Sequence, residues 1–260
     1  MKQKTAKTVS PSSPLLRGLS ILKCFSESNA ALSVTELARR TGIPQPTVWR
    51  FCQTFRSAGY LTTDSDRNLL RPGLALLGLG FSAINHFDPS QHVRRHLVAL
   101  ASRFKLVAGL TSRDGLGMRI LDRHQDADAV LSYNARIGGI LPMATTASGW
   151  AYLASLDAID RTRLVAQIAR EQPDLWELAV PSFTKALARY QREGVIVSSG
   201  AIERGLTTVA IPITSGNSAS VYPLYCSAIS SALPADVIKR ELVPMMKKYA
   251  EELRVVLPAM

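Results

Sequence analysis

Few residues of this 260-residue chain have the types and spacing that catalysis requires. His92 and His96 could present two imidazoles on one helix face, as zinc sites require, but no third ligand follows them. We expect them on a solvated face. Ser148 lacks the G-x-S-x-G elbow of hydrolases, and Cys226, in the apolar segment LYCSA, is expected in the core. The sequence therefore predicts no catalytic residues, no metal site and no cofactor.

A second group of residues, between positions 45 and 57, is suited to contacting DNA. Steps of about 100° per residue divide this segment into an apolar face and an opposite polar face without acids. The apolar face holds Val48, Phe51, Cys52 and Phe55, and the polar face holds Pro46, Arg50, Gln53 and Ser57, with Thr47 and Thr54 at its edge. Arg and Gln side chains suit guanine and adenine edges in the major groove. We expect Arg50 and Gln53 to contact bases and Thr47 and Thr54 to contact phosphates.

The elements around this segment predict a winged helix-turn-helix over residues 15–72. An apolar helical spacing begins at Leu15, and residues 33–36 form a capping box in which Ser33 and Glu36 should each bond the other's backbone amide. Gly42 ends that second helix and Gly59 the third. A hairpin with a polar turn follows over residues 60–71. Three residues of this wing are expected to contact the DNA backbone or minor groove: Arg67, Asn68 and Arg71.

The charge distribution favours a polyanion-binding module in the first quarter of the chain. Residues 1–72 carry a net charge of +7, and the remaining residues carry +4. Residues 1–14 have the composition of a disordered basic arm. Three scattered Cys favour a reducing cytosol, and neither a signal peptide nor a run of 18 apolar residues is present. We therefore expect a cytoplasmic protein without a membrane partner.

The remaining chain predicts a linker helix over residues 73–89 and an α+β domain over residues 90–260. The apolar helix Leu74–Phe87 suits packing against a second copy, so we expect a dimer or a dimer of dimers. After a helix from Gln91 to Lys105, the expected elements are strands at 106–111, 118–122 and 130–133, helices at 146–154, near 157–170 and at 182–193, strands at 195–198, 207–213 and 220–226, and a helix at 234–256. Together these elements form an antiparallel sheet flanked by helices.

Several segments, taken in order, resemble the isocitrate-lyase-regulator (IclR) family of transcription factors. They are LLRGLSILKCF, LSVTELARRTGIPQPTVWRF, SAGYLTTD, RPGLALLGLG, GGILPMATTASGWAYLA and EGVIVSSGAIERGLTTVAIPI, spread over residues 15–256. The resemblance implies a winged helix-turn-helix joined by a linker helix to a GAF/PAS-like domain. It also implies double-stranded operator DNA, a small organic or aromatic acid effector and self-association as partners.

The resemblance further implies an effector site beside the helix that follows the Leu-Pro motif. Matched by motif, the two amides at the start of that helix fall on Ala147 and Ser148. The other implied pocket residues are Met143, Trp150, Ser198, Thr208, Tyr225 and Ser227. Free amides at a helix start favour a carboxylate, and hydroxyls give directional contacts in an apolar cavity.

The chain departs from the family pattern in both regions. The family commonly has His where Ala144 stands, Lys at Trp150, an acid at Ser198 and often Cys at Thr208. These changes suggest a pocket for a larger and more apolar acid. In the DNA-contacting segment, Gln45, Pro46 and Trp49 replace the usual Lys, Ser and His, which suggests an unusual operator.

The prediction is therefore a ligand-responsive DNA-binding regulator of catabolic genes that is not an enzyme. Two alternatives remain open from the sequence. One is a metabolite-processing enzyme with an accessory DNA-binding head. The other is a constitutive DNA-binding protein whose second domain only oligomerises.

Overall fold

The computed structural model divides the chain into two compact units, residues 1–87 and 88–260. It describes residues 13–25, 29–64, 69–86, 90–129, 135–200, 204–215 and 220–257. The expected disordered arm, except its last two residues, and the expected strand at 130–133 lie outside these ranges. Among the described helices, none is long and apolar enough to cross a membrane.

The first unit is a winged helix-turn-helix followed by one apolar helix. Its elements are α1 (Ser13–Leu22), α2 (Val34–Thr41), α3 (Gln45–Ser57), β1 (Leu61–Asp64), β2 (Leu69–Pro72) and α4 (Leu74–His86). The strands pair antiparallel, with Leu61 opposite Pro72. Buried Ile21, Leu37 and Val48 give the three helices a common core, so the fold predicted for this region is confirmed. Helix α1 begins at Ser13, inside the segment assigned to the arm.

The start of α2 confirms one half of the expected capping box and corrects the other. The Ser33 hydroxyl accepts a hydrogen bond from the Glu36 amide at 3.1 Å. The Glu36 carboxylate does not return to Ser33, because it accepts from Arg39 at 2.7 and 2.8 Å and from Arg40 at 2.6 Å. A guanidinium is a stronger donor to a carboxylate than a neutral backbone amide is. These hydrogen bonds lower the Glu36 pKa to about 2.

The second unit is an α+β domain built on one antiparallel sheet in the order β5-β4-β3-β8-β7-β6. Its strands are β3 (Val107–Asp114), β4 (Gly117–Gln125), β5 (Ile140–Pro142), β6 (Ile196–Ser199), β7 (Leu206–Thr214) and β8 (Val221–Ile229). Its helices are α5 (Ser90–Phe104), α6 (Ala147–Ser155), α7 (Ala158–Glu171), α8 (Pro173–Glu193), the short η1 (Ser230–Ala232) and α9 (Ala235–Val237), the π-helical η2 (Ile238–Leu242) and α10 (Val243–Val256). The predicted α+β class is confirmed.

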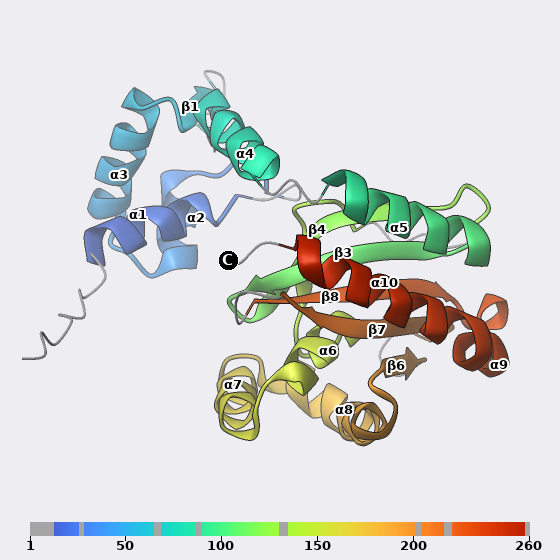
Figure 1. Cartoon of the computed structure of the whole chain (residues 1–260). Helices are drawn as coiled ribbons and strands as arrows, with labels where there is room; N and C mark the ends of the chain where they lie inside the picture. Colours follow the sequence, from blue (N-terminus) through green and yellow to red (C-terminus); the bar gives the residue numbers. More distant parts are fainter. Residues whose placement is uncertain are drawn as a thin grey trace, which may run out of the picture. The chain divides into compact units, whose positions relative to one another are not determined.

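Helices cover both faces of this sheet (Figure 1). Helices α5 and α10 lie on one face, and α6 lies on the other, with α7 and α8 outside it. On the α5 face, Arg94 of α5 donates to the carboxylate of Asp122 in β4 at 2.6 Å. On the α6 face, Tyr225 and Val107 pack with α6 residues in one buried cluster.

Three elements of the second unit differ from the sequence prediction. Helix α8 begins at Pro173, and Pro181 lies inside it instead of before it. The packing of Ala179 and Phe183 into the buried cluster on both sides of Pro181 outweighs the lost backbone hydrogen bond. Ile140–Pro142 forms an edge strand against β4. The expected helix over 234–256 contains the π-helical segment η2, whose backbone bonds span five residues.

Candidate DNA-binding and effector sites

The polar face of α3 is exposed, as the sequence predicted. Val48 and Cys52 are buried, while Arg50 and Thr54 are exposed and Gln53 is partly exposed. The Arg50 guanidinium has no carboxylate partner within the described residues, so it is available to an external acceptor. The Thr54 hydroxyl donates back to the Arg50 carbonyl at 3.1 Å. The exposed face of α3 therefore presents donors and carries no acid of its own, which suits the major groove of DNA.

The three residues that depart from the family pattern lie together at the start of α3. Gln45 and Pro46 are exposed, and the indole of Trp49 is 53% exposed. The Gln45 side chain donates to Thr35 at the start of α2, at 3.2 Å. Together with α2 and the hairpin, these residues line a groove of about 480 Å³. The exposed Trp49 ring and the donors beside it make this groove a candidate contact surface.

The cationic residues around α3 differ in how far their charge is already paired. Arg71 in β2 pairs with Asp64 across the hairpin at 2.8 Å, and both Arg39 and Arg40 share Glu36. Their attraction to phosphate is reduced by these acids. Thr47 is only partly exposed, at the edge of the face. The predicted wing contacts Arg67 and Asn68 lie outside the described residues.

The start of α6 provides two backbone amides without an acceptor in the described part of the chain. The N-cap Thr146 accepts the Gly149 amide at 3.2 Å and donates to the Pro142 carbonyl at 2.8 Å. The preceding amides, on Ala147 and Ser148, have no partner among the described residues. Both residues are buried, so these amides cannot readily bond water. A buried helix start with free amides favours an anion.

The polar pocket residues implied by the resemblance lie on the same sheet face as α6. The strand register places Ser198, Thr208 and Ser227 opposite one another on β6, β7 and β8. The Thr208 and Ser227 hydroxyls are 2.8 Å apart. Tyr225 lies two residues before Ser227 and packs in the cluster that includes Ala147. The structure thus gathers four hydroxyl-bearing side chains from three strands on the face that α6 covers.

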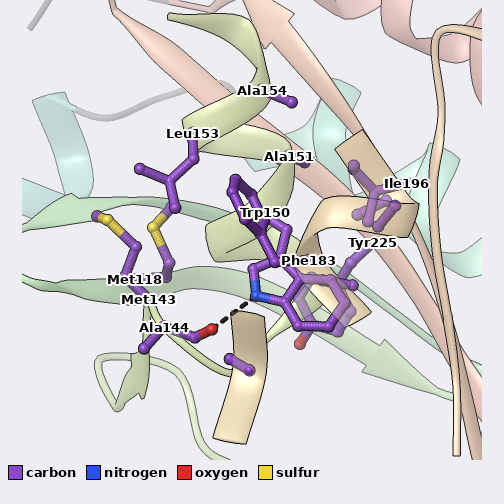
Figure 2. Close-up of a cluster of buried hydrophobic side chains, with 14 of the residues drawn as sticks. Met118, Met143, Ala144, Trp150, Ala151, Leu153, Ala154, Phe183, Ile196 and Tyr225 are labelled. Atoms are coloured by element: carbon purple, nitrogen blue, oxygen red, sulfur yellow. Dashed lines mark hydrogen bonds between the residues drawn. The ribbon is translucent and has the colours of Figure 1, made fainter. Parts of the chain in front are cut away.

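Met143 and Trp150 are both fully buried in the cluster of Figure 2. The indole nitrogen of Trp150 donates to the Ala144 carbonyl at 2.6 Å, drawn there as a dashed line. Its ring meets Phe183 of α8 edge-on, with centroids 6.2 Å apart. These contacts give Trp150 a structural role between α6 and α8. Its predicted contact with an effector stays a prediction.

Sequence reasoning did not single out Arg123 of β4, a partly buried charged residue on the sheet face that α6 covers. Its partner in the register is Gly109, whose other neighbour is Tyr225, so all three lie in one row. A bulge in β4 reverses the alternation of side chains after Ile120. A strictly alternating strand would have placed Arg123 on the α5 face. The shift of register was the only signal, and it is a tertiary feature.

The other candidate residues for chemistry are explained by packing. His96 is buried, not solvated, with 2.5 Å between its Nδ1 and the His92 carbonyl and 2.6 Å between its Nε2 and the Glu252 carboxylate. Burial raises the pKa of the Cys226 thiol. Among the described residues, no group of three His, Cys, Asp or Glu could hold a metal ion.

Comparison with known proteins identifies both units. Residues 14–65 match the family described as IclR helix-turn-helix domain, and residues 81–255 match the bacterial transcriptional regulator IclR C-terminal family. The HTH-type transcriptional regulator TsaQ1/TsaQ2 of Comamonas testosteroni is 29% identical over 92% of this chain and 86% of its own.

Two solved structures have the same fold. An IclR family transcriptional regulator from Brucella abortus is 27% identical, with a TM-score of 0.85 over 95% of this chain and 93% of its own. An IclR homologue from Microbacterium hydrocarbonoxydans, solved with 4-hydroxybenzoate, is 22% identical, with a TM-score of 0.70 over 93% of this chain and 98% of its own.

Proposed function

Because the chain belongs to the IclR family of transcriptional regulators, we propose that α3 reads an operator and that the α6 face of the sheet binds a small organic acid. The chain is a ligand-responsive, DNA-binding regulator and not an enzyme, since its relatives are regulators.

The observation that carries the effector site is the pairing of two free amides with a row of hydroxyls. The Ala147 and Ser148 amides begin α6, and Thr208 and Ser227 lie on the sheet face that α6 covers. The amides and the helix dipole stabilise a carboxylate, by about 0.3–1 kcal/mol for the dipole when exposed and up to about 2 kcal/mol when partly buried. The hydroxyls fix the orientation of the bound acid. Ser198 completes the row on β6.

We assign the effector to the aromatic acids on two supports. The cluster around the site is rich in apolar and aromatic side chains, including Met143, Trp150 and Tyr225. The Microbacterium homologue was solved with 4-hydroxybenzoate. An aromatic acid combines an apolar body with the charged group that the amides of α6 suit.

A thermal-shift assay with benzoate and its hydroxylated derivatives tests this site. A ligand that binds only the folded protein raises its stability by RT ln(1 + [L]/Kd). Ser148→Pro removes one free amide, and Ser227→Leu fills the space above the sheet. Both variants should lose the ligand-induced shift and keep operator affinity, and Thr162→Leu on exposed α7 should keep both. A full ligand response in both pocket variants would refute the site.

The operator contacts are tested by fluorescence anisotropy with the operator and its single-base variants. Arg50→Ala should cost about 1–3 kcal/mol of specific binding and relax one base position. Arg71→Ala should weaken all sequences alike and by less, because Asp64 already pairs with it. Arg163→Ala, exposed on α7, is the control. Unchanged base preference in Arg50→Ala would remove α3 from the assignment.

Self-association through α4 completes the proposal. Four large apolar side chains of α4 are exposed in the single chain, at 85%, 55%, 56% and 55%: Leu74, Leu77, Leu79 and Phe81. A second copy of the chain would bury this apolar patch. The resulting dimer has the two winged helix-turn-helix units that a palindromic operator requires. Light scattering should show a dimer or larger at micromolar concentration, and Leu77→Glu should shift it toward monomer. A monomeric wild-type protein would refute this.

The cytoplasm, where operator DNA lies, is the proposed location.

A further inference from the structure

We propose that Arg123 is a second anchor of the effector pocket, so that the effector carries a second oxygen acceptor besides its carboxylate. This inference rests on the proposed effector site. It narrows the ligands to hydroxy acids and diacids with the two groups at opposite ends of an apolar body.

Arg123 lies on the same sheet face as the proposed effector site. Opposite residues of an antiparallel pair share a face, and the register runs from Arg123 to Gly109 and on to Tyr225. The next row of that face contains Gln125 and Ser227 on either side of Val107. Neighbouring strands are about 4.8 Å apart, so β4 and β8 are separated by about 10 Å. Arg123 is therefore close to the hydroxyl row but displaced to one side of it.

The guanidinium of Arg123 is only partly satisfied. Its Nη1 donates to the Ala135 carbonyl at 2.7 Å, and its Nη2 donates to the Gln125 side chain at 3.1 Å. Its Nε is buried and has no hydrogen-bond partner among the described residues. No carboxylate of the described chain lies within ion-pair distance, and the adjacent Asp122 points to the opposite face, where it pairs with Arg94. Buried polar atoms normally have a hydrogen-bond partner, so a bound acceptor would satisfy this Nε–H.

The Tyr225 ring occupies the space above Gly109 that a side chain would otherwise fill. A Cβ at position 109 would lie 2.5 Å from both Cζ and Oη of the Tyr225 ring. The ring therefore extends across Gly109, toward the strand that carries Arg123. In this row the Nε–H of Arg123 is the donor left without a partner among the described residues, and it can take one oxygen acceptor. This donor is separate from the amides of Ala147 and Ser148.

Two donor groups on one face select a ligand with two acceptor ends. The amides of α6 take the carboxylate, and Arg123 takes a phenolic oxygen or a second carboxylate. A monoacid would leave the buried Nε of Arg123 without an acceptor, and it has none among the described residues of the free protein. The second acceptor of a two-ended ligand would bond this guanidinium, and we expect that hydrogen bond to raise affinity by about tenfold or more relative to a monoacid.

The test compares benzoate, 4-hydroxybenzoate and terephthalate by isothermal titration calorimetry on the full-length protein. For the wild type, we expect terephthalate and 4-hydroxybenzoate to bind at least tenfold more tightly than benzoate. Arg123→Gln should reduce that preference to less than threefold, with benzoate affinity nearly unchanged. Arg113→Gln is the matched control, because Arg113 is exposed on the same face of β3 and lies over the Tyr152 ring.

The outcomes separate this inference from the proposed site. If benzoate binds and the two-ended acids bind no better, the role of Arg123 is refuted and the effector site stands. The same holds if Arg123→Gln keeps the wild-type preference. If none of the three acids binds the wild type, the proposed site fails and the inference falls with it. Thermal unfolding of each variant without ligand verifies that it is folded, and Arg123→Lys gives a second, charge-conserving variant in case Arg123→Gln does not fold.

Discussion

Replacement of Trp150 distinguishes a packed core residue from a residue that lines a pocket. The side chain is fully buried, its indole nitrogen donates to the Ala144 carbonyl at 2.6 Å, and its ring meets Phe183 edge-on. These contacts predict a large loss of stability on truncation. A pocket wall, in contrast, would lose ligand affinity with little change in stability.

The magnitude follows from the contacts that each variant removes. Truncation of a buried Trp to Ala costs about 3–5 kcal/mol, which includes a resulting cavity. Trp150→Phe keeps most of the ring but leaves the buried Ala144 carbonyl without its donor, at a cost of about 1–3 kcal/mol. We expect losses of about 4 and about 2 kcal/mol. Trp49→Ala, at an exposed position of the head, should change stability by less than about 0.5 kcal/mol.

Urea unfolding of the full chain, followed by far-ultraviolet circular dichroism, measures these losses. With a slope of about 2 kcal/mol/M, Trp150→Ala should lower the midpoint of the second domain by about 2 M. The urea midpoint for unfolding of the winged helix-turn-helix unit should stay at its wild-type value. A midpoint within about 0.3 M of wild type for Trp150→Ala, with a changed preference among aromatic acids, would refute the core assignment.

Two further predictions concern titratable groups. Burial raises the pKa of the Cys52 thiol to about 11 and also raises the pKa of the Cys226 thiol. At pH 8 a disulfide reagent should therefore label only the less buried Cys24 in the folded protein, and all three thiols after unfolding. Rapid labelling of Cys226 in the folded protein would contradict its burial. The hydrogen bond from His96 lowers the Glu252 pKa from 4.5, so the stabilisation is present above pH 4.5 and is lost as pH falls through the folded-state value. Melting temperatures of Glu252→Gln and wild type should therefore differ at pH 6 and converge as the pH falls well below 4.5, and a constant difference would contradict the pairing.

Local rules predicted most of the head. Periodicity placed Val48 and Cys52 in the core and Arg50 on the open face, because a helix packed on one side repeats its burial every turn. The capping box succeeded for the Ser33 hydroxyl, which acts within its own turn. It failed for Glu36, because Arg39 and Arg40 compete for the same carboxylate. The sequence cannot show whether Glu36 caps the helix or pairs with the two arginines, because the choice depends on side-chain rotamers.

Local patterns also predicted most strands and helices of the second domain, whereas the grouping of its candidate site residues came only from the resemblance. The resemblance brought Thr208 and Ser227 together, and the register confirms that they are neighbours. The sheet face of Arg123 could not be predicted, because one extra residue in β4 changes the face of every later side chain in the strand. Helix α8 was shortened in the prediction because Pro181 reads as a helix boundary, whereas tertiary packing holds the helix through it.

The adjacency of Asp122 and Arg123 gives the sheet a mechanical property. One residue faces the proposed pocket, and the next pairs with Arg94 on α5, the first helix after the linker. A single peptide unit therefore joins a side chain on one face to a side chain on the other. A rotation of that unit would move both side chains. Replacing Arg94 and Arg123 singly and together, and measuring ligand-dependent operator release, yields the coupling free energy between the two faces. A value near zero would mean that the signal leaves the pocket by another route.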